Sequence, residues 1–253
     1  MQQNISYQGN RFLLFLRSGL LFTSVLMVTI ILASVIFIIA LFSKKMCFKI
    51  ARFWSICTLF LAKIICGIDY HVTGLENISE DHNAIVLCKH QSAWETIFLT
   101  AALPPSCILL KKSLLWIPFW GWAMAALKPI AIDRSSPKQA LSQLLKQGAK
   151  RLQEGYWIVM YPEGTRTAPG EQRKFSASGS LLAMRTGFPV IPIAHNAGEF
   201  WPRNSFLKFP GVIQVKIGPA ISAENRKSKE INAEAEAWIK NAMQEIDTTK
   251  PHF

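Results

Sequence analysis

The segment CKHQSAWET, residues 88–96, contains a histidine and, five positions later, a carboxylate. On one continuous helix these two residues would point about 140° apart, so they meet only if His90 lies in a turn and Glu95 in the first turn of the following helix. The carboxylate can then bind one imidazole nitrogen and leave the other free as a general base. His90 and Glu95 are therefore candidates for a catalytic pair.

Glu95 also has a purely structural interpretation. Ser92 followed by Glu95 three residues later matches a capping box, in which the glutamate reaches back to the backbone N–H of the serine. A histidine at the end of a strand is often structural as well. These nine residues leave both interpretations open.

Basic side chains follow three apolar runs elsewhere in the chain: Lys111 with Lys112, Arg134, and Arg166. Arg166 directly follows the segment Pro162–Thr165, whose proline and glycine are typical of a turn. A guanidinium at the end of a strand can bind phosphate in bidentate fashion. Each cation alone would be an ordinary surface charge, but together with His90 they predict a site for a phosphorylated substrate beside a general base.

The elements that must position these residues alternate in type. Seven short apolar or β-branched runs have the length of strands: 70–74, 84–88, 106–110, 129–133, 157–161, 190–194 and 212–218. Residues 135–155 and 225–247 have helical spacing of apolar residues. We therefore expect an α/β domain with a mixed, largely parallel sheet flanked by helices, and a site in the loops after the strands.

The N-terminal part predicts a membrane segment. Residues 20–42 carry no charge and are long enough to cross a hydrocarbon layer as a retained helical anchor. Residues 46–68 form a basic amphipathic helix in which Lys49, Arg52 and Lys63 share one face, as in a helix at the bilayer interface. The alternative is a second buried helix whose basic residues face solvent. We expect a two-helix membrane segment over residues 1–68 and a catalytic domain over residues 69–253.

The charge supports a lipid partner. The chain has a net charge of +12, and residues 1–68 contain seven Lys or Arg and no Asp or Glu. Because no nucleic-acid-binding motif accompanies this charge, anionic membrane lipid is the expected partner and nucleic acid is not. The basic residues after the span favour a cytoplasmic-membrane protein with its catalytic domain on the cytoplasmic side. Five cysteines without Cys-x-x-Cys spacing agree with a reducing compartment.

Five segments occur in the order of a known family pattern. They are HQSAWE (90–95), KSLLWIPFWG (112–121), IDR (132–134), EGTR (163–166) and VIPI (190–193). Together they resemble the four-block pattern of the glycerolipid acyltransferases, and most closely the bacterial lysophosphatidic acid acyltransferases, over residues 70–220. The first block of that family usually ends in Asp where this chain has Glu95, and Lys128-Pro129 makes the second block a looser match.

The resemblance implies a role for each matched residue. His90 would remove the proton from the free hydroxyl of lysophosphatidic acid, and Glu95 would orient its imidazole. The hydroxyl would then attack an acyl thioester, of acyl carrier protein or of coenzyme A, to give phosphatidic acid without a metal or cofactor. Arg166, Lys111 and Arg134 would bind the phosphate, while Glu163, Gly164 and Thr165 would shape the Arg166 loop. Residues 116–127 would supply both core and acyl-chain groove.

Other functions stay open at this point. A serine lipase would need a G-x-S-x-G motif, which the chain does not contain. A non-catalytic lipid-binding protein would need the basic anchor but neither His90 nor Glu95. Within the enzymes, the alternative acceptors are another lyso-lipid or glycerol 3-phosphate.

Overall fold

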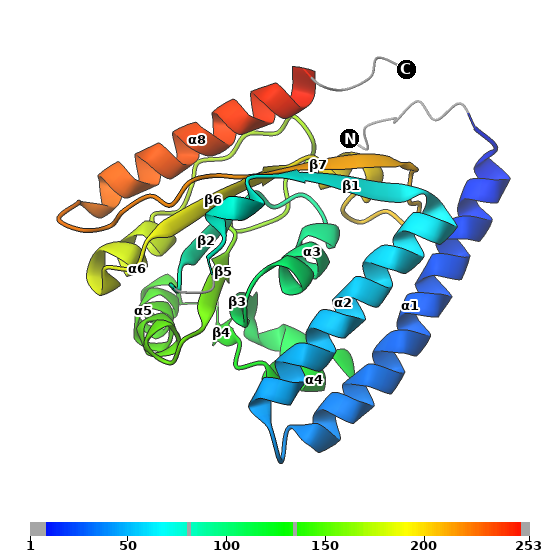
Figure 1. Cartoon of the computed structure of the whole chain (residues 1–253), viewed down its shortest axis with the longest axis horizontal. Helices are drawn as coiled ribbons and strands as arrows, with labels where there is room; N and C mark the ends of the chain where they lie inside the picture. Colours follow the sequence, from blue (N-terminus) through cyan, green and yellow to red (C-terminus); the bar gives the residue numbers. More distant parts are fainter. Residues whose placement is uncertain (1–8, 80–81, 134–135, 249–253) are drawn as a thin grey trace.

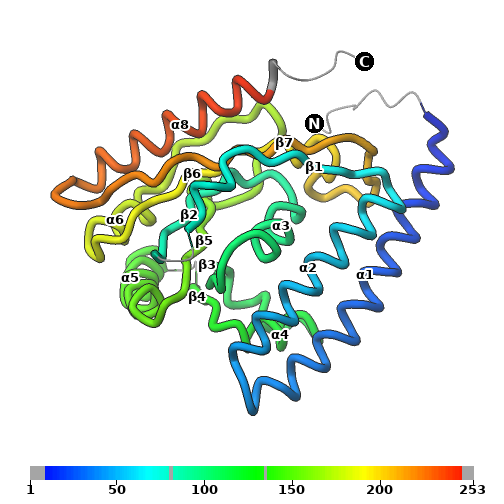
Figure 2. Tube along the Cα trace, in the orientation of Figure 1, coloured from blue at the N-terminus to red at the C-terminus, as the bar shows by residue number. Residues whose placement is uncertain are grey.

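The chain begins with two long antiparallel helices (Figures 1 and 2). The computed structural model describes residues 9–79, 82–133 and 136–248. Helix α1, Arg11–Ile39, begins after Asn10, whose side chain accepts hydrogen bonds from the backbone N–H groups of Phe12 and Leu13. Helix α2, Lys44–Cys66, begins after Ser43 and ends at Gly67, which takes a left-handed conformation.

Within the described residues, seven strands form one sheet in the order β1-β7-β6-β2-β5-β3-β4. The strands are β1 Ile68–Thr73, β2 Ile85–Cys88, β3 Ser106–Lys111, β4 Ile130–Ile132, β5 Trp157–Met160, β6 Val190–His195 and β7 Gly211–Ile217. Neighbouring strands are parallel except β6 and β7, which are antiparallel. All seven predicted strands are present, and the prediction of a mixed, largely parallel α/β sheet is confirmed.

Helices cover both faces of this sheet (Figure 1). On one face lie α5 Pro137–Gln153, α6 Ser178–Thr186 and α8 Ser228–Thr248, which bury Leu152, Leu182 and Ile231 against the strands. On the other lie α3 Trp94–Ala102 and α2, which bury Trp94 and Leu59. The remaining short helices are α4 Trp120–Ala126, α7 Ala197–Phe200, η1 Leu75–Asn77 and η2 Lys112–Trp116.

The first helix leaves most of its apolar surface uncovered. Among the described residues, α1 is the one helix that is long and apolar enough to cross a bilayer, and little of its most apolar stretch is buried. It begins nine residues before the charge-free run at 20–42, because Asn10 caps it there. The prediction of a long apolar N-terminal helix is confirmed.

The second helix is both part of the core and part of the surface. Leu59, Ala62 and Cys66 pack in the same core as Trp94 and Ile213 of the α/β domain. The basic residues predicted to share one face, Lys49, Arg52 and Lys63, are all exposed. Lys63 pairs with Asp69, at 2.8 Å between Nζ and Oδ2. The structure therefore also fits the alternative, in which the second helix packs on the protein and its basic residues face solvent. The domain boundary at residue 68 stays a prediction.

Candidate active site

The turn between β2 and α3 brings the predicted pair together. His90 follows β2, and Glu95 is the second residue of α3. Nδ1 of His90 lies 2.7 Å from Glu95 Oε1. Because the carboxylate accepts the Nδ1 proton, Nε2 carries no proton in the neutral ring and is the basic nitrogen. The His90 side chain is 15% exposed, whereas that of Glu95 is only 1% exposed.

Glu95 also holds the backbone of the turn. Its Oε1 accepts hydrogen bonds from the backbone N–H groups of Gln91, at 3.0 Å, and Ser92, at 2.9 Å. Ser92 Oγ in turn accepts from the N–H of Trp94. The capping geometry and the histidine contact therefore occur together on one oxygen. The helix itself begins after Ala93, which makes no side-chain cap, so only the glutamate half of the predicted capping box is present, beside the contact with His90.

The surroundings keep Glu95 ionised. Burial by itself raises the pKa of this carboxyl, but the hydrogen bond from His90, the charge of that ring when protonated and the Ser92 N–H lower it, and the net pKa lies below its usual value. An anionic Glu95 bonded to Nδ1 stabilises the imidazolium that forms when His90 accepts a proton. The pair therefore has the electrostatics of a general base that accepts a proton.

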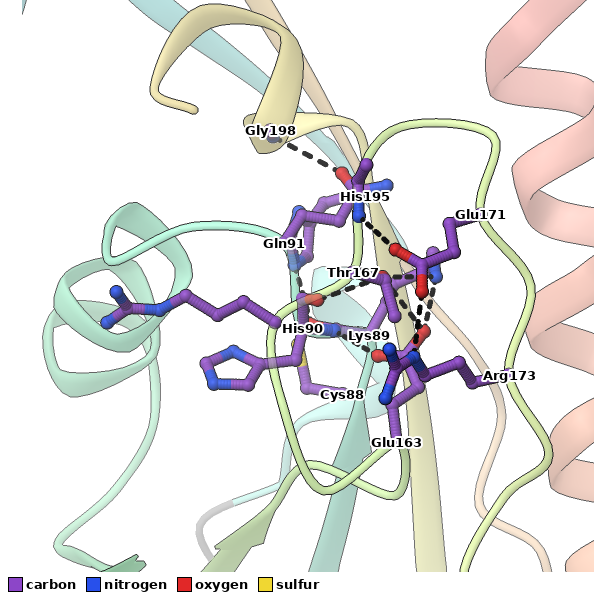
Figure 3. Close-up of polar contacts among 12 residues, drawn as sticks. Cys88, Lys89, His90, Gln91, Glu163, Thr167, Glu171, Arg173, His195 and Gly198 are labelled. Carbon is purple, nitrogen blue, oxygen red and sulfur yellow. Dashed lines mark hydrogen bonds and ion pairs between the residues drawn. The ribbon is translucent and has the colours of Figure 1, made fainter. Parts of the chain in front are cut away.

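A buried network fixes the backbone on the other side of His90 (Figure 3). Lys89 Nζ pairs with Glu163 Oε1 and donates to Thr167 Oγ1 at 3.2 Å. Glu163 Oε2 accepts the N–H of His90 at 2.7 Å, and the N–H of Thr167 donates to the His90 carbonyl at 2.8 Å. The imidazole points away from this cluster. The network thereby ties the loop after β5 to the turn after β2.

The side chains of Tyr161 and His195 also support this turn. The ring of Tyr161 stacks on His90, with 3.9 Å between ring centroids, and its hydroxyl lies 2.7 Å from Thr96 Oγ1. His195 is buried at the end of β6. Its Nδ1 accepts the N–H of Ala197 at 3.1 Å, so its Nε2 carries the proton and donates to the Lys89 carbonyl at 2.8 Å. Burial lowers the pKa of His195, which agrees with a neutral ring.

The exposed side of His90 faces a large cavity of about 1230 Å³. Its lining includes apolar residues of α1, α3, β3 and α4, among them Leu32, Ile97, Leu110 and Met124. The charged residues in the described lining are all basic: Lys45, Lys49, Arg52, Lys111, Arg166 and Arg203. Such a cavity, with a largely apolar lining and only basic residues among its described charged groups, suits an anionic amphiphile.

The structure brings most of the predicted site residues to this cavity. His90, Lys111, Gly164, Thr165 and Arg166 line it. Glu163 does not, because its side chain is buried against Lys89 behind the turn. Glu95 supports His90 from below the cavity surface. Arg134 lies outside the described residues.

The loop after β5 owes its shape to a glycine. Gly164 has φ +72°, a left-handed conformation that other residues adopt only with strain. Its N–H donates to the Tyr161 carbonyl at 3.0 Å, which closes the turn. The turn carries Thr165 and Arg166 to the cavity and turns Glu163 inward.

Residues 116–127 differ in exposure, and an acyl-chain groove along them stays a prediction. Ile117, Trp120 and Met124 line the cavity, whereas Trp116 is 81% exposed. Among the residues that the structure describes, no three His, Cys, Asp or Glu side chains gather as metal ligands do.

Sequence reasoning missed Lys89, Tyr161, His195 and Arg203. Lys89 directly precedes His90, and Tyr161 lies two residues before Glu163, each just after a strand, and that position was a usable signal. His195 lies at the end of the VIPI strand, where its buried contacts gave no pattern in the sequence. Arg203 lies in a loop beyond all the recognised blocks, so nothing local marked it.

Comparisons with known proteins agree on a family. A family model described as Acyltransferase matches residues 69–196. A 1-acyl-sn-glycerol-3-phosphate acyltransferase of Pseudomonas aeruginosa is 51% identical over 196 residues, which are 76% of each chain. One of Saccharomyces cerevisiae is 30% identical over 200 residues, covering 77% of this chain and 64% of the relative.

A solved structure extends the likeness to the N-terminal helices. The crystal structure of the 1-acyl-sn-glycerophosphate (LPA) acyltransferase of Thermotoga maritima superposes with a TM-score of 0.78. It covers 95% of this chain and 97% of that chain at 20% sequence identity. At this identity the likeness concerns the fold, including the two-helix segment.

Proposed function

The chain belongs to the acyltransferase family, and from that premise we propose that His90 is the general base of an acyl transfer to lysophosphatidic acid. The enzyme is a 1-acyl-sn-glycerol-3-phosphate acyltransferase, as the resemblance of its motifs implied. It transfers a fatty acyl group from a thioester to the free hydroxyl of lysophosphatidic acid and forms phosphatidic acid. The observation that carries our proposal is the 2.7 Å contact of Nδ1 with Glu95, which leaves Nε2 of His90 as the basic nitrogen beside the cavity.

The chemical step needs one base. Nε2 of His90 takes the hydroxyl proton as the acceptor oxygen forms its bond to the thioester carbonyl carbon. The C–S bond then breaks, and the imidazolium returns the proton to the leaving thiolate. Glu95 stabilises the imidazolium between these two events, because it is anionic and bonded to Nδ1. The acyl group passes directly between substrates, so no covalent acyl-enzyme forms.

Binding of the phosphate falls to the cations of the cavity. We assign Arg166 and Lys111 to the acceptor phosphate, since both line the cavity with His90. Gly164 and Thr165 form the turn that presents Arg166, and Glu163 anchors that turn from inside. Arg134 is expected to assist, although it lies outside the described residues. The apolar lining suits the acyl chains of the two substrates.

The enzyme associates with the membrane through its N-terminal helices. The uncovered apolar surface of α1 and the exposed Lys49 and Arg52 of α2 support docking to anionic lipid. We propose that residues 1–68 hold the mouth of the cavity at the cytoplasmic face of the inner membrane. A lipid acceptor could then enter without exposing its chain to water, which costs about 0.8 kcal/mol for each methylene.

Turnover of purified protein tests the general base. Release of free thiol is measured with acyl-coenzyme A and acyl carrier protein thioesters against lysophosphatidic acid, other lyso-lipids and glycerol 3-phosphate. His90→Ala should lower kcat at least about a hundredfold. His71→Ala is the matched control, because His71 lies exposed on β1 and does not line the cavity. Near-normal turnover of His90→Ala would contradict the mechanism, and preference for another acceptor would redirect the substrate assignment.

A further inference from the structure

Arg203 brings another cation to the cavity from a separate part of the chain. It lies in the loop 201–210 between α7 and β7, beyond residues 69–196 that the family model matches. Its side chain is 36% exposed and lines the cavity together with His90 and Arg166. No recognised motif contains it. Its position nevertheless places a guanidinium where an anionic substrate would bind.

The contacts of Arg203 place it beside Arg166. Its Nη1 donates to the backbone carbonyl of Arg166, and its Nη2 lies 3.8 Å from Glu171 Oε2. A guanidinium has five N–H donors, so these contacts leave donors for a ligand. Glu171 does not line the cavity, and the described lining contains no carboxylate that would compete with a bound anion. A doubly charged group such as a phosphate monoester can therefore bind to both guanidinium groups.

The loop 201–210 is anchored on two sides, which fixes Arg203 relative to the catalytic turn (Figure 2). On one side, the N–H of Lys208 donates to Ser18 Oγ of α1 at 2.9 Å. The ring of Phe206 lies 5.1 Å from that of Phe15, also on α1. On the other side, Ser92 Oγ, in the turn after His90, donates to the Trp201 carbonyl at 2.6 Å. Arg203 is therefore held between the membrane helix and the catalytic turn.

We propose that Arg203 acts with Arg166 to bind the phosphate monoester of the lyso-lipid acceptor. This assignment rests on the proposed function, because it takes lysophosphatidic acid as the acceptor. Arg166 and Arg203 surround the phosphate from two loops, the first after β5 and the second after α7. The donor thioester of coenzyme A also carries phosphates, so the experiment must separate the two substrates.

Steady-state kinetics of Arg203 variants make this separation. Arg203→Gln can still donate a hydrogen bond to the Arg166 carbonyl but carries no charge, so it should raise KM for lysophosphatidic acid about tenfold or more. We expect kcat to change less than about threefold and KM for acyl-coenzyme A to stay unchanged, since the lost contact is made equally before and during the chemical step. Arg203→Lys should recover part of the loss.

Arg173→Gln is the matched control. Arg173 also pairs with Glu171, at 2.8 Å between Nε and Oε1, but does not line the cavity. Its KM for lysophosphatidic acid should equal that of the wild type. An equal rise of KM in Arg173→Gln would show that the effect comes from Glu171 and the loop, and would overturn the assignment. A rise in KM for acyl-coenzyme A alone would place Arg203 in the donor site and would also overturn it.

Equilibrium binding keeps the test independent of turnover. Binding of a short-chain, soluble lysophosphatidic acid is measured without donor, beside the matching monoacylglycerol that lacks the phosphate. Arg203→Gln should weaken binding of the first about tenfold and leave the second unchanged. If the wild type fails to acylate lysophosphatidic acid, the proposed function fails, while this binding difference still decides whether Arg203 contacts phosphate. Equal binding of lysophosphatidic acid by wild type and variant would refute the inference.

Discussion

Replacing Glu95 by glutamine separates its charge from its hydrogen bonds. The three donors on Oε1, from His90, Gln91 and Ser92, can all be accepted by the amide oxygen of glutamine. The variant therefore keeps the cap and the ring orientation but loses the negative charge beside the imidazole. Any loss of activity then measures electrostatic stabilisation of the imidazolium.

The size of the loss follows from the geometry. Opposite unit charges about 4 Å apart attract by about 4 kcal/mol at an effective dielectric constant of about 20. Since each 1.36 kcal/mol is about a tenfold change in rate, the full charge corresponds to about a thousandfold. The retained neutral hydrogen bond returns part of this, so we expect kcat to fall about 10²–10³-fold in Glu95→Gln.

The assay is thiol release at saturating substrates, measured well below the melting temperature of the variant. This precaution is needed because the new NH₂ group occupies the position of Glu95 Oε2, which has no hydrogen-bond partner among the described residues. A buried amide without an acceptor costs about 1–3 kcal/mol of folding free energy. Melting curves and circular dichroism therefore accompany the kinetics.

Glu95→Asp is the complementary control, because it keeps the charge and shortens the reach. It should retain more activity than Glu95→Gln, although about an ångström of misplacement lowers catalytic efficiency. Activity of Glu95→Gln within about threefold of the wild type would refute the electrostatic reasoning and leave Glu95 as a cap alone. Complete inactivity of the Asp variant would instead show that the site is built around the longer side chain.

Three further predictions follow from the network and the surface. Glu163→Gln leaves the buried ammonium of Lys89 uncompensated, which costs about 3–5 kcal/mol and should lower Tm by about 6–20 °C. Because burial lowers the pKa of His195, the unfolded chain binds a proton that the native state does not as pH falls below about 6.5, so native stability falls with it. His195→Gln should therefore lose less Tm than the wild type between pH 7.5 and 5.5. The double variant Lys49→Glu, Arg52→Glu should weaken binding to anionic vesicles at least about thirtyfold, since each basic residue contributes about 1 kcal/mol.

Each of these predictions has a matched control. Glu171→Gln removes a partly exposed carboxylate from the same region, and its Tm should change by less than about 3 °C. A parallel decline of Tm in the wild type and His195→Gln would mean that His195 does not contribute to the acid sensitivity. For vesicle binding, Lys138→Glu, Lys146→Glu reverses two exposed lysines on α5, on the opposite face of the sheet, and should have little effect. If both double variants bind equally weakly, net charge rather than the face of α2 controls docking.

Sequence patterns were sufficient where the determining interactions are local. The strands follow from short β-branched runs, and the turn at His90 follows from an apolar run that ends just before Ser92 and α3. The His90–Glu95 contact spans only five residues, so the secondary structure alone brings the pair together. The same locality explains why the capping box could be recognised.

Sequence patterns left a choice open where one residue can serve in two ways. Capping and catalysis were alternatives for Glu95 in the sequence. In the structure, one buried oxygen, Oε1, accepts both the hydrogen bond from His90 and the hydrogen bond from the Ser92 N–H. Glu163 was expected to shape the loop that presents Arg166, and the sequence did not show which way its side chain points. Gly164 reverses the chain between them, so Glu163 points into the protein toward Lys89.

By itself the sequence determined the α/β alternation, the apolar N-terminal helix, the contact between His90 and Glu95 and the position of cations at strand ends. These depend on periodicity, turn residues and spacing along the chain, which are properties of neighbouring residues. Only the tertiary structure decided that Lys89 meets Glu163 across 74 positions, that His195 contacts the Lys89 carbonyl across 106, and that Arg203 reaches Arg166 from a separate loop. Such contacts form because parallel strands bring their carboxyl ends to one edge of the sheet, and which side chains meet there is set by strand order, which no local pattern encodes.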